Sequence, residues 1–366
     1  GQKEQKQPEV KESLGRKIYK DLMNGVSNML PFVIGGGILI AIAFLLDDYS
    51  IDPSNFGKNT PIAAYFKTIG EFAFGMMLPV LSGFIAMSIA DRPGLAVGFV
   101  AGLVAKAGST FLNPAGGDVN AGFLGALFAG FAAGYVILAL KKLTNKIPQS
   151  LNSIRPMIIY PVAGILIGAV VTTLINPFMG IINDALTGVL HNMSGTSRVL
   201  LGTICAGMQS VDMGGPVNKT SYVFATSQLA EGNFEIMASV MAGGMVPPLA
   251  IAFCTTFLQK SVLQKKERES GLVNYLLGLS FISEGAIPFA ASDPLRVIPS
   301  CIVGSAVAGG LSMFFECTLR APHGGVFVLP TIGHPMMYVL SILIGSLVGC
   351  AILGILKKTI KRRTVK

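Results

Sequence analysis

Long apolar stretches alternate with short polar segments along most of the chain. A helix needs about 20 mainly apolar residues to cross a bilayer, and several stretches approach that length. The pattern therefore predicts an all-α polytopic membrane protein with about eight full transmembrane helices. We expect these crossings at residues 29–46, 72–90, 93–107, 121–140, 156–175, 235–258, 297–316 and 336–356, of which 93–107 is the shortest.

The amino-acid composition agrees with this class of protein. The 366 residues are 51% hydrophobic and only 13% charged, with 44 glycines and no Trp. Soluble domains usually carry about 25% charged residues. Abundant glycine suits close helix–helix contact in lipid, because small residues let two backbones approach each other.

The net charge of +9 is concentrated beside the apolar stretches. Nineteen of the 28 Lys and Arg residues fall in four patches, at 1–28, 141–146, 260–268 and 357–366. Basic residues that flank membrane spans mark cytoplasmic loops. The charge is therefore a topology signal that places both termini in the cytoplasm, and it does not indicate nucleic-acid binding.

Both ends of the chain are expected to lie outside the hydrocarbon region. Residues 1–12 are a predicted solvated linker, since Gln, Lys and Glu predominate without apolar periodicity. Residues 13–28 predict an amphipathic helix on the membrane surface, and residues 357–366 predict a basic cytoplasmic tail.

Two polar segments interrupt the apolar pattern in the second half of the chain. The first is Asp212–Lys219 (DMGGPVNK), and the second runs from Ser283 to Arg296 (SEGAIPFAASDPLR). Polar and helix-breaking residues are costly at membrane depth, so they mark a solute pathway. The crossings keep the basic patches on one side only if neither segment spans the membrane. We expect two re-entrant hairpins, at about 199–230 and 272–294, which enter from opposite faces and meet near mid-membrane. Two kinked helices with structural Gly and Pro are the alternative.

The sequence contains no pattern that indicates a metal or cofactor. Its five cysteines are scattered and resemble small buried apolar residues, and its three histidines are equally dispersed. We predict neither a metal site nor a bound cofactor.

Five motifs make the sequence similar to a known family. They are MGGPVNK, SEGAIPFAASDPLRVIPS, APHGGVFVLP, IADRPG and NAGFLGAL. From about Gly25 to Leu356, the chain resembles the membrane-spanning IIC domain of bacterial phosphotransferase-system (PTS) sugar transporters of the fructose family.

The resemblance implies a homodimeric carrier in the bacterial inner membrane, which binds an external sugar and presents it inside. A partner IIB domain that carries a phosphocysteine would phosphorylate the sugar there, together with a IIA domain and upstream PTS proteins. The resemblance also implies a scaffold of dimerising helices, assigned to 29–190. A transport domain, assigned to 191–356, would move past this scaffold as a rigid body.

The chain would thus be the membrane component of a phosphoenolpyruvate-dependent sugar phosphotransferase. We find no phosphocysteine loop of a IIB domain and no phosphohistidine site of a IIA domain, so this chain alone should not phosphorylate sugar. The N-terminal linker suggests that such domains are fused upstream or exist as separate chains.

Glu284 and His323 are the candidates for proton chemistry. A carboxylate at a hairpin tip accepts hydrogen bonds from sugar hydroxyls and can act as a general base on the attacking hydroxyl. The resemblance favours Glu284 for sugar contact, and capping of a broken helix is the alternative. Imidazole is a hydrogen-bond partner or a proton carrier near neutral pH, although His323 can also hold its own loop together.

The remaining candidates surround the same two breaks. Asn218 offers both a donor and an acceptor to a sugar hydroxyl. Lys219 steers the phosphoryl group or pairs with Glu284 or Asp212, and Arg296 pairs with Asp293 or meets the phosphate or the IIB partner. The other predicted substrate-site positions are Asp212, Gly214, Gly215, Pro216, Ala286 and Pro288.

Fructose is the default substrate, and 2-O-mannosylglycerate remains open within the family. An ion-coupled secondary sugar transporter is the main alternative, because broken helices and a buried carboxylate also suit sodium or proton coupling. A membrane sensor that does not transport is disfavoured, since the two polar hairpins would have no purpose there.

Overall fold

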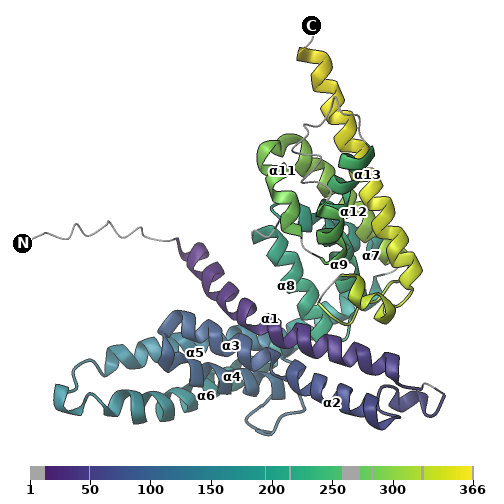
Figure 1. The fold of residues 1–366 in the computed structure, drawn as a ribbon. Coiled ribbons are helices and arrows are strands. Elements are labelled where there is room, and N and C mark those ends of the chain that lie inside the picture. Colours follow the sequence, from purple (N-terminus) through teal and green to yellow (C-terminus); the bar gives the residue numbers. More distant parts are fainter. Residues whose placement is uncertain are drawn as a thin grey trace, which may run out of the picture. The chain divides into compact units, whose positions relative to one another are not determined.

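The structure is a computed structural model, and it is helical almost throughout (Figure 1). It describes residues 13–48, 50–193, 195–213, 216–257, 273–281, 283–322 and 325–364. Within these ranges the only bridge of β type joins Thr318 to Gly333. The expectation of an all-α protein is therefore confirmed.

Seven helices in the described ranges are long and apolar enough to cross a membrane. The sequence predicted about eight crossings, and the one absent from these seven is 93–107. It corresponds to α4 (Arg92–Ala107), which has only 16 residues. The segments that qualify by length and hydropathy are Leu14–Leu46, Pro61–Ala90, Gly122–Leu143, Arg155–Leu190, Glu235–Phe257, Pro294–Phe314 and Pro335–Lys358.

The chain divides into two compact units. Unit 1 comprises residues 1–31 and 76–185, and unit 2 comprises residues 32–75 and 186–366. Helix α1 (Leu14–Leu46) contributes to both, and so does α6 (Ile165–Asn192). The expected surface helix at 13–28 is continuous with the first predicted crossing, since α1 has no break.

Unit 1 is built on α3 (Met77–Ala90), which is buried along almost its whole length. It packs against α4 and α5 (Gly122–Leu143), and the π-helical segment η3 (Arg155–Gly164) leads into α6. Glycines permit the closest contacts. A Cβ on Gly98 would lie 2.7 Å from Gly83 Cα, and a Cβ on Gly102 would lie 2.9 Å from Pro79 Cα. Small residues thus let α3 and α4 approach backbone to backbone.

Unit 2 is built around α9 (Glu235–Phe257), and nearly every residue of this helix is buried. Its remaining long helices are α2 (Pro61–Gly75), α7 (Thr196–Gly207), α8 (Pro216–Ala230), α12 (Pro294–Phe314) and α13 (Pro335–Thr364). Short helical turns connect them: η4 (Met208–Ser210), η5 (Ser283–Ala286), α11 (Ile287–Ser292) and η6 (Val326–Thr331). A helix that is buried on all sides forms the core of its unit and has little surface that faces lipid.

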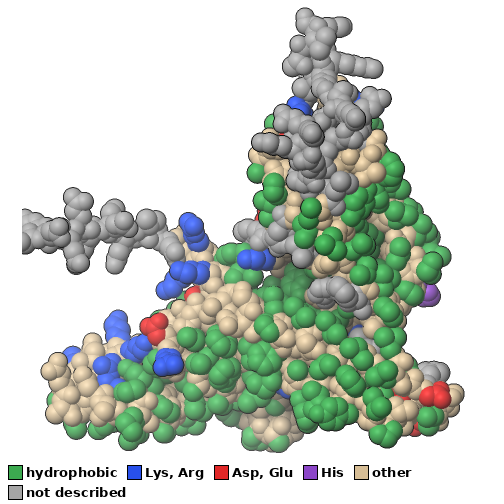
Figure 2. Space-filling view, viewed as in Figure 1, with side chains coloured by type: hydrophobic (Ala, Val, Ile, Leu, Met, Phe, Trp, Pro, Cys, Tyr) green, Lys and Arg blue, Asp and Glu red, His purple; other side chains and the backbone are tan. Residues whose placement is uncertain are grey.

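Large apolar side chains are exposed on the sides of several helices. Phe72, Phe178 and Leu166 are 70%, 67% and 63% exposed. Figure 2 shows hydrophobic side chains over much of the visible helix surface. Contiguous apolar surface of this extent is costly in water and marks contact with a bilayer.

Candidate functional site

The first polar segment forms a break between two helices of unit 2. Helix α7 ends in the turn η4, residues 211–213 are not helical, and α8 begins at Pro216. Asp212 stabilises this start, because its two carboxylate oxygens accept hydrogen bonds from the backbone N–H groups of Val217 (2.8 Å) and Asn218 (2.9 Å). A carboxylate there satisfies unpaired N–H groups and complements the helix dipole. Predicted positions Gly214 and Gly215 lie outside the described residues.

Gln209, which the sequence analysis did not select, fixes the geometry of this break. It is 3% exposed. Its amide N–H groups donate to the Asn218 carbonyl (3.1 Å) and to the Ser221 hydroxyl. In return, the Asn218 side chain donates to the backbone carbonyl (2.8 Å) and the side-chain oxygen (3.1 Å) of Gln209. The Asn218 donor is therefore used within the protein, whereas its Oδ1 acceptor has no partner within the described ranges.

Lys219 is exposed and makes no ion pair among the described residues. Of the two partners expected for it, Asp212 instead caps α8. The second expected partner, the side chain of Glu284, lies outside the described part of the chain. A solvent-accessible ammonium without a carboxylate partner in the described ranges is available to meet an anionic group.

The second polar segment is a run of short helical turns. Glu284 lies within η5, and α11 follows directly. Ala286 is fully buried, whereas Pro288 is exposed. Asn274, a residue that the sequence analysis missed, is 1% exposed and packs against Gly285, where an added Cβ would collide with its Oδ1. That oxygen has no hydrogen-bond partner among the described residues. A buried unpaired acceptor is costly, so a role for this oxygen beside the Glu284 turn would offset that cost.

The structure brings the two polar segments together. Met213, from the first segment, belongs to the same buried cluster as Ala286 and Phe289 from the second. Gly244 of α9 provides a further meeting point, because a Cβ there would lie 2.7 Å from the Phe281 ring and 3.3 Å from Gln209 Oε1. The prediction that two distant polar segments converge is thus supported by side-chain packing within unit 2.

The loop that contains His323 is attached to the same region. His323 itself lies outside the described residues, but the Tyr222 hydroxyl of α8 donates to the Pro322 carbonyl at 2.9 Å. The Arg320 guanidinium lies over the rings of Phe44 and Phe234, 4.5 Å from each centroid. Such cation–π contacts fix a charged side chain without a carboxylate. Tyr222 lies one helical turn after Asn218. The same helix, α8, therefore contacts the His323 loop and borders the break in the first polar segment.

Asp293 begins α12 and forms the expected ion pair. Its Oδ2 atom lies 3.0 Å from Arg296 Nη1 and 3.8 Å from Lys357 Nζ. The structural pair between Asp293 and Arg296 is confirmed, and contact of Arg296 with a phosphate or a partner domain stays a prediction. In the described part of the chain, no group of His, Cys, Asp and Glu is arranged to hold a metal ion.

The geometry defines a class of protein: a helical membrane protein in which the second unit brings together two polar segments and the His323 loop, where helices are broken. Residues 23–304 match the family described as "Phosphotransferase system, EIIC". The chain belongs to this family, as its motifs indicated.

Named relatives and one solved structure resemble the chain over most of its length. It is 48% identical to the PTS system fructose-specific EIIABC component of Bacillus subtilis (strain 168), over 96% of this chain and 53% of the relative. It is 48% identical to the fructose permease IIC component of Bacillus amyloliquefaciens, over 86% of this chain and 100% of the relative. The chain thus spans about half the length of the first relative.

The solved structure is that of the transporter ChbC, the IIC component from the N,N'-diacetylchitobiose-specific phosphotransferase system. It shares 12% identity with this chain, covers 94% of both chains and has a TM-score of 0.58. At that identity the likeness concerns the fold alone.

Proposed function

We propose that this chain is the membrane component of a fructose-specific phosphotransferase system. It binds external fructose and presents it inside for phosphorylation by a phosphocysteine IIB domain. The observation that carries this proposal is the convergence of the two polar segments and the His323 loop in unit 2. The names of the two Bacillus relatives support fructose over 2-O-mannosylglycerate.

The polar residues at this convergence take distinct roles in the proposal. Glu284 accepts hydrogen bonds from the sugar and acts as general base on the hydroxyl that attacks the phosphocysteine. The Oδ1 acceptor of Asn218 receives a sugar O–H, while Gln209 holds the Asn218 amide in place. The exposed Lys219 attracts the incoming phosphoryl group. His323 contacts the sugar or carries its proton.

The division into two compact units supports a transport step in which one unit moves past the other. We assign unit 2 to the moving transport domain and unit 1 to the dimerising scaffold, and this places residues 32–75 with the moving part. The two re-entrant hairpins lie at about 199–230, around η4 and α8, and at about 272–294, around the Glu284 turn, with both chain termini in the cytoplasm. IIA and IIB domains, fused or separate, supply the phosphoryl group.

The test is phosphoenolpyruvate-dependent uptake into membrane vesicles that contain this chain and its IIA and IIB domains. Radiolabelled fructose, mannose, mannitol and 2-O-mannosylglycerate are compared, and the internal sugar is analysed for phosphate. We expect fructose phosphate as the main product and no phosphorylation by the purified chain alone. Glu284→Gln keeps the side-chain shape and removes the charge, so it should bind fructose weakly and abolish phosphorylation.

Two results would overturn the proposal. Accumulation of unmodified sugar that an uncoupler abolishes would indicate an ion-coupled transporter instead. Normal phosphorylation in Glu284→Gln, with the variant folded, would remove this carboxylate from the mechanism.

A further inference from the structure

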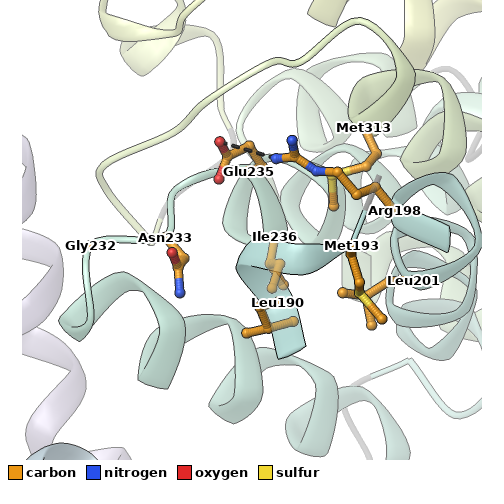
Figure 3. Close-up of a pocket in the computed structure, with 9 residues that line it drawn as sticks. All are labelled: Leu190, Met193, Arg198, Leu201, Gly232, Asn233, Glu235, Ile236 and Met313. Atoms are coloured by element: carbon orange, nitrogen blue, oxygen red, sulfur yellow. Dashed lines mark ion pairs between the residues drawn. The ribbon is translucent and has the colours of Figure 1, made fainter. Parts of the chain in front are cut away.

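A cavity separate from the predicted sugar residues lies in unit 2 at the start of α9 (Figure 3). Its volume is about 210 Å³. It is lined by Leu190, Met193, Arg198, Leu201, Gly232, Asn233, Glu235, Ile236 and Met313. None of the residues predicted for sugar binding is among them, so the cavity requires its own explanation.

Two opposite charges stand at one side of this cavity. Arg198 and Glu235 point toward each other in Figure 3, with 3.3 Å between Nη2 and Oε1. Their side chains are 34% and 31% exposed, and neither makes another polar contact within the described ranges. A guanidinium has five N–H donors and a carboxylate accepts about four hydrogen bonds, so one contact leaves most of this capacity unused. The cavity therefore offers both a donor cation and an acceptor anion to a ligand.

The rest of the lining is mainly apolar and is formed where helices end. Leu190 lies in the last turn of α6, Glu235 is the first residue of α9, and Met313 lies in the last turn of α12. All three belong to segments that qualify as membrane spans. The ends of such helices lie at the level of lipid headgroups, because about 20 residues cover the hydrocarbon core.

The helices that line the cavity also carry exposed apolar side chains, which suit contact with lipid. Leu200 and Ile204 of α7 are 58% and 54% exposed, and Phe314 at the end of α12 is 66% exposed. A ligand in the cavity meets the paired charges, and the helices α7 and α12 that line the cavity carry exposed apolar side chains. This is the arrangement of a phospholipid, whose charged headgroup continues into acyl chains.

We propose that the cavity binds the headgroup of a membrane phospholipid that carries both a phosphate and a primary ammonium, as phosphatidylethanolamine does. Arg198 contacts the phosphate and Glu235 accepts hydrogen bonds from the ammonium, while the acyl chains follow the exposed face of α7. A purely anionic headgroup would satisfy Arg198 but face repulsion from Glu235. A quaternary ammonium, as in phosphatidylcholine, has no N–H to donate. The proposal requires that the chain lies in a bilayer and does not depend on its sugar specificity.

The absence of Trp from the chain permits a direct test. Leu200→Trp places one fluorophore on an exposed position of α7, next in sequence to Leu201 of the cavity lining, and Ile355→Trp, on an exposed position of α13, is the control. Each full-length variant is reconstituted in phosphatidylcholine vesicles, and part of the lipid is replaced by a species with brominated acyl chains. Quenching of Trp fluorescence reports the lipid next to the fluorophore.

We expect brominated phosphatidylethanolamine to half-quench the Leu200→Trp variant at a mole fraction about fivefold below that of brominated phosphatidylcholine, since one exposed ion pair contributes about 1 kcal/mol. Phosphatidylglycerol should not show this preference, and neither should any lipid at the Ile355→Trp control. Adding Glu235→Gln should remove the difference. Glu71→Gln, which disrupts the similarly exposed Lys58–Glu71 pair (3.1 Å), should leave the difference unchanged.

Three outcomes would overturn the inference. Superimposed quenching curves for the two zwitterionic lipids would mean that only unselective boundary lipid contacts this face. Loss of quenching on addition of fructose would assign the cavity to sugar. Loss of quenching on addition of free phosphoethanolamine at micromolar concentration would assign it to a soluble ligand.

Discussion

The two units share one use of polar side chains and differ in another. In both, polar side chains bind backbone carbonyls: in unit 1 the half-buried Asn24 amide donates to Phe84 O at 2.8 Å and the Asn176 amide to Ser109 O at 2.9 Å, and in unit 2 the Ser305 hydroxyl donates to Gly243 O at 2.8 Å. In unit 2, Gln209, Asn218 and Ser221 bind one another across a break between helices. Polar groups of the first kind fasten helices together, whereas those of the second kind form a fixed arrangement of side chains that a ligand can meet.

Close helix packing through glycine is common to both units. It occurs between α3 and α4 in unit 1, and between α12 and α13 in unit 2, where a Cβ on Gly304 would lie 2.7 Å from Gly345 O. Unit 2 contains non-helical backbone between η4 and α8, which is tolerated at membrane depth only where protein or a cavity surrounds it. The units therefore differ in this break and not in their close helix packing, and we infer that the break serves recognition. The predictions that follow challenge this distinction, from the largest expected effect to the smallest.

Of the variants considered, Gly98→Leu in unit 1 should lower the free energy of unfolding most. Even the first side-chain atom would lie 2.7 Å from Gly83 Cα and Ser82 O, so α3 and α4 must separate. We expect a loss of about 3 kcal/mol or more in the free energy of unfolding, measured in mixed detergent micelles. Gly188→Leu is the control, because a Cβ at Gly188 has no neighbour within 4 Å. Equal losses in the two variants would refute the close-packing argument.

Gln209→Ala should impair recognition and stability together. The substitution removes the amide that donates to the Ser221 hydroxyl and the Asn218 carbonyl, and the side-chain oxygen that accepts from Asn218, at a cost of about 2 kcal/mol. Fructose affinity should fall because the break loses its shape. Gln228→Ala is the matched control: Gln228 is 2% exposed, lies in α8 and is bound to Asn233. A similar drop in affinity in both variants would count against a special role for Gln209.

Asp212→Ala should have a smaller effect on stability. It removes the carboxylate that caps α8 at Val217 and Asn218, which costs about 1 kcal/mol. Asp212→Asn retains one acceptor oxygen and should recover part of the loss. Thermal unfolding of the three proteins checks this order, and an alanine variant as stable as the original would exclude the capping role.

The smallest effect is expected from acid, which should destabilise the loop after α1 that contains Asp47. Partial desolvation raises the pKa of Asp47, but hydrogen bonds from the backbone N–H groups of Asn59, Gly57 and Thr60 together lower it below its ordinary value of 3.8. A depressed folded-state pKa stabilises the protein above the unfolded pKa, and this stabilisation is lost as pH falls through the folded pKa. The stability advantage over Asp47→Asn should therefore shrink below about pH 4. A difference that stays constant from about pH 6 to about pH 3 would contradict this assignment.

The sequence was sufficient for the fold class and for locating the two polar segments of the candidate site. Hydropathy located the long helices, and the breaks at Pro216 and Ser283 were visible because Gly, Pro and charge are costly in apolar surroundings. It did not reveal that residues 32–75 pack with the second half of the chain. That grouping depends on contacts such as Gly37 against Ala321 and the Arg320 guanidinium over the Phe44 ring, which hydropathy does not encode.

Single residues were harder to predict than segments. Gln209 and Tyr222 lie outside the recognisable motifs, and only folding shows that one holds Asn218 and the other binds the His323 loop. The spacing of Asp293 and Arg296 was enough to predict their pairing, since it is local. Asp212 was considered for substrate contact, but its carboxylate is occupied by the start of α8.

The central claim is that recognition of the sugar resides in the side-chain network of unit 2, and one pair of variants tests it most directly. Asn218 and Asn24 each donate a side-chain amide to a backbone carbonyl at 2.8 Å, the first in unit 2 and the second in unit 1. Equilibrium binding of radiolabelled fructose is measured for Asn218→Asp, Asn24→Asp and the original protein. We predict that Asn218→Asp raises the Kd for fructose at least about tenfold while Asn24→Asp leaves it nearly unchanged. Equal affinities in the two variants, or a larger loss in Asn24→Asp, would contradict the account.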